Sequence, residues 1–292
     1  MLSSRAVGAP SPWLCNCLAV SPGGAVSFLG EGMSLLNVDE SGCAGPGPSN
    51  LGVSRPMSQA WSADGTLLVV GARQQVVLFQ RAAASAGGSG ALERVYSKSL
   101  HFEPRGSAVA NRIGRGGATV VAVAGVAGVE IYFLGASWQQ IGATLRVQPE
   151  YNILHVSFAP SGRFLALATL EGHLGVWETA FIAERNGAVG SAPAAAEDEI
   201  PPAAHTDVVT QGRVTTVLFS HVGSMLAVMT WDGILKVYQE VQRGRWHNIS
   251  GTHLREPLCA SQFLSEHPPP LIAWTLNCDG ILCVLPCTIL VA

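Results

Sequence analysis

One stretch of the sequence decides the fold: Ile153-Leu-His-Val-Ser-Phe-Ala-Pro-Ser-Gly162, then Arg163-Phe-Leu-Ala-Leu-Ala-Thr169. It predicts an apolar strand, a turn that contains proline and glycine, and a second apolar strand. The turn residues Glu171-Gly172 and a third strand, Leu174-Gly-Val-Trp177, follow directly. Glycine favours tight turns between strands, so the whole stretch predicts a small antiparallel sheet.

The same template recurs along the chain and predicts an internal repeat. The other copies run from Gln59 to Phe79, from Val214 to Tyr238 and, more weakly, from Cys17 to Val38, from Ala118 to Phe133 and from Cys259 to Val284. Their turns recur at intervals of roughly 40 to 60 residues, which suits four short strands with their connections. A small sheet cannot bury both of its faces alone, so neighbouring units must stack. The strand spacing by itself also fits a β-sandwich or barrel without a repeat.

The composition supports a β-rich globular chain. Of the 292 residues, 48% are hydrophobic, only 13% are charged and 33 are glycine, and the formal net charge is −3. These values exclude a largely disordered chain, and glycine without a triplet period excludes collagen. Two insertions, near 82–91 and 183–204, are rich in small residues or proline and are predicted to be flexible surface segments.

The cysteines and apolar runs bear on the cellular compartment. The seven cysteines are odd in number and include no Cys-x-x-Cys pair, and no signal peptide is visible, so a disulfide framework is not expected. The apolar runs Ala118–Val129 and Ile281–Ala292 are too short to span a membrane. We therefore expect an intracellular protein without a membrane span.

Several turns and strand ends carry a family resemblance. They are Phe158-Ala-Pro-Ser-Gly162, Phe219-Ser220, Trp61-Ser-Ala-Asp-Gly65, Trp231-Asp-Gly233 and Gly175-Val-Trp-Glu178. These segments resemble the WD-repeat β-propeller family, although no unit ends in the family's Trp-Asp dipeptide. The resemblance implies an all-β fold: a single β-propeller domain over residues 1–292, with six to seven four-stranded blades.

The number of blades leaves the closure of the ring open. Six units are recognisable, and a complete seventh does not fit. Either six blades close the ring, or one blade is completed by the chain ends, by a continuation of the native chain beyond Ala292, or by another protein. An incompletely closed propeller would present a sheet edge that can accept a partner strand.

The resemblance also implies structural histidines. In that family a Gly-His element precedes a blade, and His205 and His253 lie where such an element could fall. Asp232 and Asp279 lie in the tight turns of the same units. The resemblance therefore implies hydrogen bonds within a blade between His205 and Asp232 and between His253 and Asp279.

No motif predicts catalysis, a cofactor or a metal. The chain contains no phosphate-binding Gly-x-x-x-x-Gly-Lys loop, no His-Glu-x-x-His and no Gly-x-Ser-x-Gly nucleophile elbow. The eight histidines are dispersed, and none pairs with cysteine at a metal-ligand spacing. We predict that the protein is not an enzyme, and a catalytic site in the central channel is the less favoured alternative.

Two basic stretches are candidate interaction surfaces. The residues predicted for such a surface are Arg105, Arg112, Arg115, Arg243, Arg245, Trp246 and Arg255. Exposed arginines can contact an acidic partner or phosphate, and an exposed tryptophan can anchor an interface. The alternatives are solvated loops and, for Trp246, packing between blades. The tryptophans predicted to lie in the core are Trp61, Trp177, Trp231 and Trp274.

A narrower resemblance bears on function. Asp232-Gly-Ile-Leu-Lys-Val-Tyr238 followed by Gly244-Arg-Trp-His-Asn-Ile-Ser250 resembles propeller subunits of transcription assemblies, the Mediator tail and a general factor of RNA polymerase III. We therefore predict a non-catalytic scaffold, a propeller subunit of a multisubunit assembly with other protein subunits as partners. The resemblance implies a role in transcription and favours the nucleus over the cytoplasm. The alternative is a propeller that binds peptides or nucleic acid through its Arg-rich loops.

Overall fold

The computed structural model describes the backbone of residues 18–20, 25–28, 32–37, 49–82, 91–113, 117–126, 128–141, 144–147, 152–179, 205–208, 213–220, 222–242, 244–253, 258–265, 271–276 and 281–286. Side chains are described at residues 51–82, 91–111, 117–126, 128–141, 144, 152–179, 213–220, 222–242 and 244–249. Apart from residues 82 and 91, both predicted insertions lie outside the described residues.

Six antiparallel sheets follow one another along the described chain, and five of them have four strands. The first three sheets comprise β1 (Leu18–Val20), β2 (Ala25–Phe28), β3 (Gly32–Asn37) and β4 (Ser49–Ser54); β5 (Pro56–Trp61), β6 (Leu67–Ala72), β7 (Gln75–Arg81) and β8 (Leu92–Ser99); and β9 (Pro104–Ile113), β10 (Ala118–Gly125), β11 (Gly128–Leu134) and β12 (Leu145–Val147). The others comprise β13 (Ile153–Phe158), β14 (Phe164–Thr169), β15 (His173–Glu178) and β16 (His205–Val208); β17 (Val214–Phe219), β18 (Met225–Thr230), β19 (Ile234–Gln242) and β20 (Arg245–His253); and the three-stranded sheet of β21 (Leu258–Ser265), β22 (Leu271–Leu276) and β23 (Ile281–Pro286).

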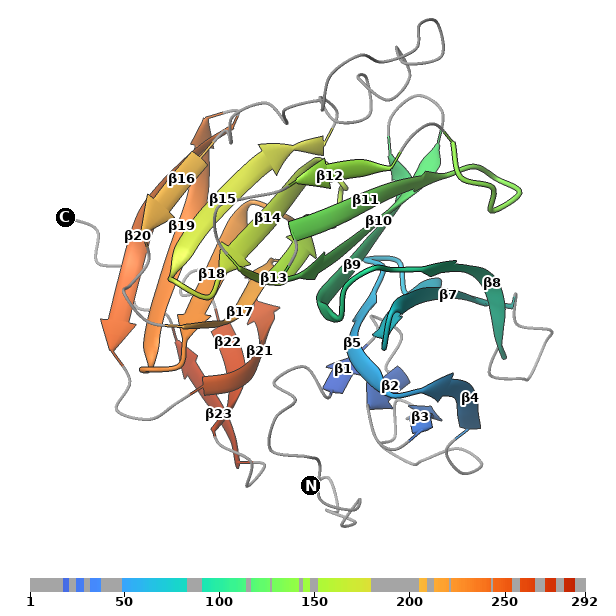
Figure 1. Ribbon diagram of the computed structural model, residues 1–292. Helices are drawn as coiled ribbons and strands as arrows, with labels where there is room; N and C mark the ends of the chain where they lie inside the picture. Colours follow the sequence, from blue (N-terminus) through green and yellow to red (C-terminus); the bar gives the residue numbers. More distant parts are fainter. Residues whose placement is uncertain are drawn as a thin grey trace, which may run out of the picture.

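The sheets are arranged around a common centre, with the first strand of each sheet innermost (Figure 1). Successive inner strands contact one another, from β1 to β5 and on through β9, β13 and β17 to β21. Among the described strands, none joins the first sheet to the last, so the ring is not closed by a shared sheet. The predicted all-β fold with four-stranded units and incomplete closure is confirmed.

Glycine closes the turn between the first and second strands of three sheets, as the template requires. Gly65, Gly162 and Gly223 have φ angles of 67°, 68° and 81°. Each backbone N–H donates to the carbonyl oxygen three residues earlier, of Ser62, Ala159 and Ser220, at 2.9, 2.7 and 2.9 Å. A side chain with a Cβ is strained at such φ values, so these positions favour glycine.

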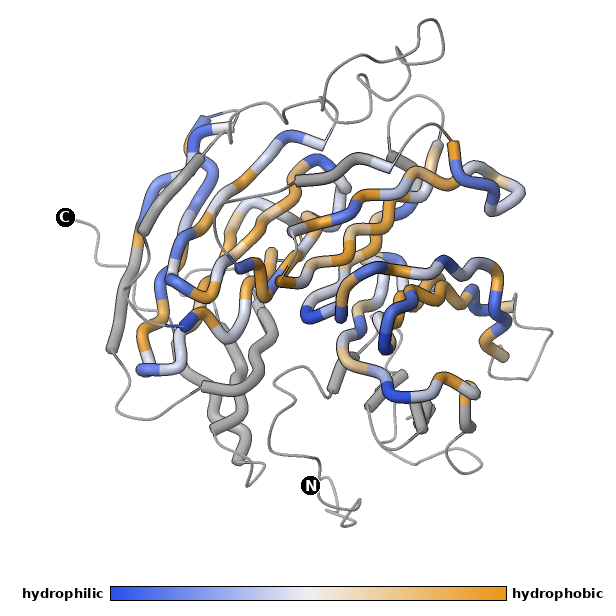
Figure 2. Tube along the Cα trace, viewed as in Figure 1, coloured by the Kyte–Doolittle hydropathy of each residue, from blue (hydrophilic) through white to orange (hydrophobic). Residues whose placement is uncertain are grey.

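The apolar core lies between neighbouring sheets. The second strands β6, β14 and β18 are buried at every residue, so both of their faces are covered. One cluster joins β9–β11 to β13 and β14, and a second joins β14 and β15 to β17–β20. Figure 2 shows that apolar stretches run within the strands and polar stretches favour the connections. The low charge of the chain follows from this sandwiching of sheets.

The inner strands share a β-bulge at one position. Five of the six sheets have one extra inner-strand residue near its start, and these residues are Met57, Arg105, Leu154, Thr215 and Cys259. A bulge bends its strand and changes the direction of a side chain. The inner strands β5 and β9 also lie close together, as shown by a buried 2.6 Å hydrogen bond between the hydroxyls of Ser58 and Ser107. The bulges at Met57 and Arg105 lie within two residues of this contact.

Candidate interaction surfaces

One end of the sheets, which we call the turn face, is formed by two kinds of connection. These are the turns between second and third strands and the loops that precede inner strands, and the antiparallel topology places both at the same end. Equivalent hydrogen bonds join them in three sheets. The donor and acceptor pairs are Arg73 N–H to Arg55 C=O at 3.2 Å, Leu170 N–H to Asn152 C=O at 2.8 Å, and Trp231 N–H to Arg213 C=O at 2.8 Å.

Apolar side chains are exposed at one equivalent position of the turn face. Val126, Leu170 and Trp231 each directly follow the second strand of three consecutive sheets, and they are 57%, 38% and 47% exposed. The prediction that Trp231 belongs to the core is therefore wrong. The fully buried strand β18 ends at Thr230, and the first turn residue lies beyond the sandwiched part of the sheet.

Four exposed arginines lie on the same face. Arg55 and Arg213 directly precede β5 and β17, Arg73 lies in the turn after β6, and Arg105 lies in the bulge of β9. Within the described part of the chain, none of these guanidinium groups has an ion pair or a side-chain hydrogen bond. Burying an arginine against an acidic partner would therefore break no existing pair.

The structure separates the arginines predicted from sequence. Arg105 is exposed on the turn face, whereas Arg245 is exposed at the opposite end of the sheets, where β20 begins. Arg115, Arg243 and Arg255 lie outside the described residues, and the side chain of Arg112, at the far end of β9 from Arg105, is also outside the description. The described members of the predicted set thus do not form one patch.

Trp246 is not an exposed anchor. Its side chain is only 4% exposed and packs edge-on against Phe164 and Phe219, with ring centroids 5.4 and 5.7 Å away. It belongs to the core cluster between the sheets β13–β16 and β17–β20. Trp246 therefore packs between blades, which was the alternative to an exposed anchor, and it does not belong to the interaction surface.

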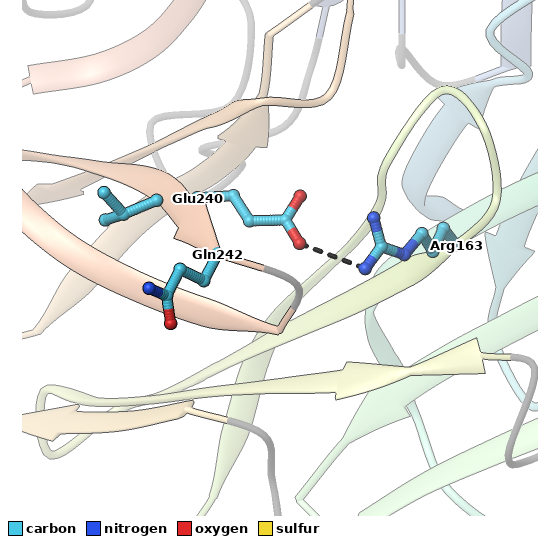
Figure 3. A pocket seen from close by; sticks show the side chains of 4 residues that line it. Arg163, Glu240 and Gln242 are labelled. Carbon is cyan, nitrogen blue, oxygen red and sulfur yellow. Dashed lines mark ion pairs between the residues drawn. The ribbon is translucent and has the colours of Figure 1, made fainter.

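The opposite end of the sheets also holds an ion-pair cluster around Arg163 (Figure 3). Arg163 Nη2 lies 3.1 Å from Glu240 Oε1 and 3.3 Å from Glu178 Oε1. The Gly244 N–H also donates to Glu240 Oε1 at 2.9 Å. Arg163 and Glu240, with Val241 and Gln242, border a concavity of about 480 Å³. Because two carboxylates already neutralise Arg163, this cluster connects two sheets and is a poor site for an anion.

A second, smaller cavity lies beside three of the inner strands. It has a volume of about 140 Å³ and is bordered by the inner strands β5, β9 and β13 and the turns that follow β5 and β13. Its described lining consists of alanine, valine, phenylalanine, tryptophan, serine and proline residues, without a titratable side chain. Among the described residues, no three His, Cys, Asp or Glu side chains gather as a metal site requires. None of them forms a helix long and apolar enough to cross a membrane.

Comparison with solved structures follows this geometry. The β-propeller domain of Cps50 (Swd1) from Myceliophteria thermophila matches with a TM-score of 0.60 and 12% identity, over 98% of this chain and 88% of that one. A chain of the Mitotic Checkpoint Complex matches with a TM-score of 0.61 and 18% identity, over 96% and 76%. The fold is a β-propeller. No protein-family model matches the sequence, and no curated protein does.

The two predicted histidine–aspartate pairs include side chains that lie outside the described residues. His205 lies in β16, whereas Asp232 lies in the turn between β18 and β19 of the next blade. The side chains of His205 and His253 and the whole of Asp279 lie outside the description, so both pairings stay predictions.

A pair of this kind occurs elsewhere in the propeller. His101 Nε2, in the loop before β9, lies 2.8 Å from Oε1 of the buried Glu130 in β11, and the Tyr132 hydroxyl donates to Glu130 Oε2. The sequence signal for this pair was a histidine three residues before an inner strand, but its partner is a glutamate inside a strand rather than an aspartate in a turn. Sequence reasoning therefore missed it.

His155 adds a pH-dependent element between two blades. Its side chain, on β13, is 7% exposed. Burial lowers the pKa of His155 to about 4, the nearby Arg213 acts in the same direction, and a hydrogen bond to the Val214 backbone opposes them. The unfolded chain therefore takes up a proton on this residue at a higher pH than the folded chain does.

We expect the propeller to lose stability as the pH falls from about 6.5 towards 4. Above that window His155 is neutral in both states; inside it only the unfolded state is protonated, so protonation favours unfolding. Between about pH 7.5 and 5.5 this residue should account for a loss of about 1 kcal/mol, seen in urea unfolding curves. His155→Leu should flatten the dependence, whereas His247→Gln, at an exposed histidine, should not. An unchanged slope in His155→Leu would show that other groups cause the dependence.

Proposed function

We propose that this β-propeller is a non-catalytic scaffold that binds other protein subunits in a multisubunit assembly. The observation that carries the proposal is the turn face, where exposed apolar side chains recur at one position of three successive blades and four exposed arginines lie on the same face. Exposed apolar groups beside arginines are typical of protein interfaces. The propeller supplies a rigid support for them, because its inner strands and core clusters connect successive blades.

The similar structures support the same class of function. One is a β-propeller domain, and the other is a chain of the Mitotic Checkpoint Complex. Both are distant in sequence, so they support a shared architecture and not a shared partner. The described lining of the smaller cavity contains no titratable side chain and so offers no general acid or base there, which supports binding over catalysis.

The finer assignments rest on the sequence resemblance. We place the chain among degenerate WD-repeat propellers, in an intracellular transcription assembly, with the nucleus favoured over the cytoplasm. A propeller that binds peptides or nucleic acid through arginine loops is the second candidate, favoured by the four unpaired arginines of the turn face. If phosphate backbones are the target, affinity should fall steeply as salt is raised.

Co-purification tests the proposal. The full chain, tagged and expressed in its native cells, should recover a reproducible set of proteins in near-constant ratios, and the complex should elute earlier than the isolated chain in size exclusion. The tag alone, expressed at the same level, is the control. Recovery of a clean monomer from native extract would contradict a scaffold role, and recovery that disappears after nuclease treatment would favour nucleic-acid binding.

A further inference from the structure

Three of the unpaired arginines gather at the junction of the blades β5–β8 and β9–β12. The Arg73 N–H donates to the Arg55 carbonyl at 3.2 Å, which places the two residues side by side. A Cβ on Gly71, two residues before Arg73, would lie 2.8 Å from Cβ of Pro104, the neighbour of Arg105. Arg55, Arg73 and Arg105 therefore form one exposed cluster, which we call the arginine corner.

The apolar residues Val126, Leu170 and Trp231, which we call the apolar row, continue from this corner. They occupy in the next three blades the turn position that Arg73 occupies in its own blade. The fourth unpaired arginine, Arg213, is hydrogen-bonded through its carbonyl to Trp231. Moving around the face, the equivalent position is thus basic in one blade and apolar in the following three.

We propose that the turn face binds an acidic segment of a partner protein, with its carboxylates on the arginine corner and its apolar side chains on the apolar row. The inference rests on the proposed scaffold function and adds the surface and the partner chemistry. Guanidinium groups bind carboxylates through paired, charge-assisted hydrogen bonds, and the apolar row gains from losing contact with water. Among the described residues of the face, the four arginines outnumber the exposed carboxylates Glu103 and Asp232 and the part-buried Glu171.

The apolar row distinguishes a protein segment from nucleic acid. A phosphate backbone would satisfy the arginines, but it would leave Val126 and Leu170 in water, since only the ring of Trp231 offers a surface on which bases stack. A partner with carboxylates at one end and apolar side chains along the rest satisfies both parts of the surface. The face therefore favours a protein segment over an oligonucleotide.

Fluorescence anisotropy with the full chain tests the surface. The probe is a synthetic peptide with a block of Asp and Glu followed by a block of Leu and Phe, and two comparison peptides carry Lys in the first block or Ser in the second. We expect only the acidic–apolar peptide to bind. The double variant Arg73→Glu/Arg105→Glu and the single variant Trp231→Ala should each weaken binding by about tenfold or more.

The matched control reverses two exposed arginines away from the turn face, Arg94→Glu/Arg245→Glu, and should leave affinity unchanged. Circular dichroism checks that all variants are folded. Equal losses in test and control variants, unchanged binding in the test variants, or tighter binding of a single-stranded oligonucleotide would overturn the inference. Co-purification separates the two proposals: if the turn-face variant keeps the wild-type partners, the surface is wrong and the scaffold role stands, whereas a wild-type chain without partners contradicts the scaffold role.

Discussion

Replacing Trp246 by alanine will destabilise the propeller by about 3–5 kcal/mol, because it removes a large aromatic side chain from a closed core. Trp246 comes from β20, the outer strand of its blade, yet it packs against Phe164 of the neighbouring blade and Phe219 of its own. The substitution leaves a cavity where three aromatic rings meet, so it weakens the interface between two blades. Chemical unfolding followed by circular dichroism measures the loss.

Trp231→Ala is the matched control, since it removes the same side chain from an exposed turn. It should change stability by no more than about 0.5 kcal/mol. Similar losses in the two variants would mean that burial between blades does not distinguish these tryptophans. Within the described residues, Nε1 of Trp246 is buried without a hydrogen-bond partner. Trp246→Phe, which keeps a ring and removes that donor, should therefore cost less than Trp246→Ala.

The second large effect concerns the distance between inner strands. Gly106 of β9 lies so close to β13 that a Cβ would come within 2.7 Å of the Leu154 carbonyl oxygen and 3.2 Å of the His155 Cα. Both obstacles are backbone, which cannot rotate away as a side chain can. We expect Gly106→Ala to separate β9 from β13 and to cost about 2–3 kcal/mol, measured as a shift of the urea midpoint.

Gly135→Ala supplies the comparison for Gly106→Ala. There the new Cβ would lie 3.2 and 3.4 Å from Cδ1 and Cγ1 of Ile141, an exposed and flexible side chain, and the Gln139 carbonyl oxygen is 3.8 Å away, at an ordinary contact distance. The expected cost is within about 0.5 kcal/mol. If Gly106→Ala has the same urea midpoint as Gly135→Ala, then the inner strands are able to move apart without loss of stability.

The sequence predicted the blades well because the physical signals for them are local. An apolar strand, a turn glycine and a second apolar strand lie within about twenty residues, and the turn glycines Gly65, Gly162 and Gly223 adopt the positive φ that the template implies. Burial of both strand faces followed from the apolar residues on both faces of β14 and β18.

The candidate surface was less predictable because it is assembled across blades. Arg55 and Arg73 are isolated in the sequence, and only the equivalent ends of their strands bring them together with Arg105. Trp231 was misjudged because a turn residue next to a buried strand shares its composition but not its environment. For Trp246 the signal existed: a lone apolar residue between Arg245 and His247 fits the alternation of a strand with one buried face.

Each of these core clusters is shared by two adjacent blades, so neighbouring blades stabilise one another. Unfolding therefore starts most easily at the terminal blades. A partner bound to a terminal blade would slow the unfolding that starts there, and so also the unfolding of the blades that follow it. A partner bound across the turns of several blades would instead hold those blades together, since separating any two of them would require the partner to dissociate. Protection against proteolysis in the bound state would therefore extend well beyond the residues that the partner touches.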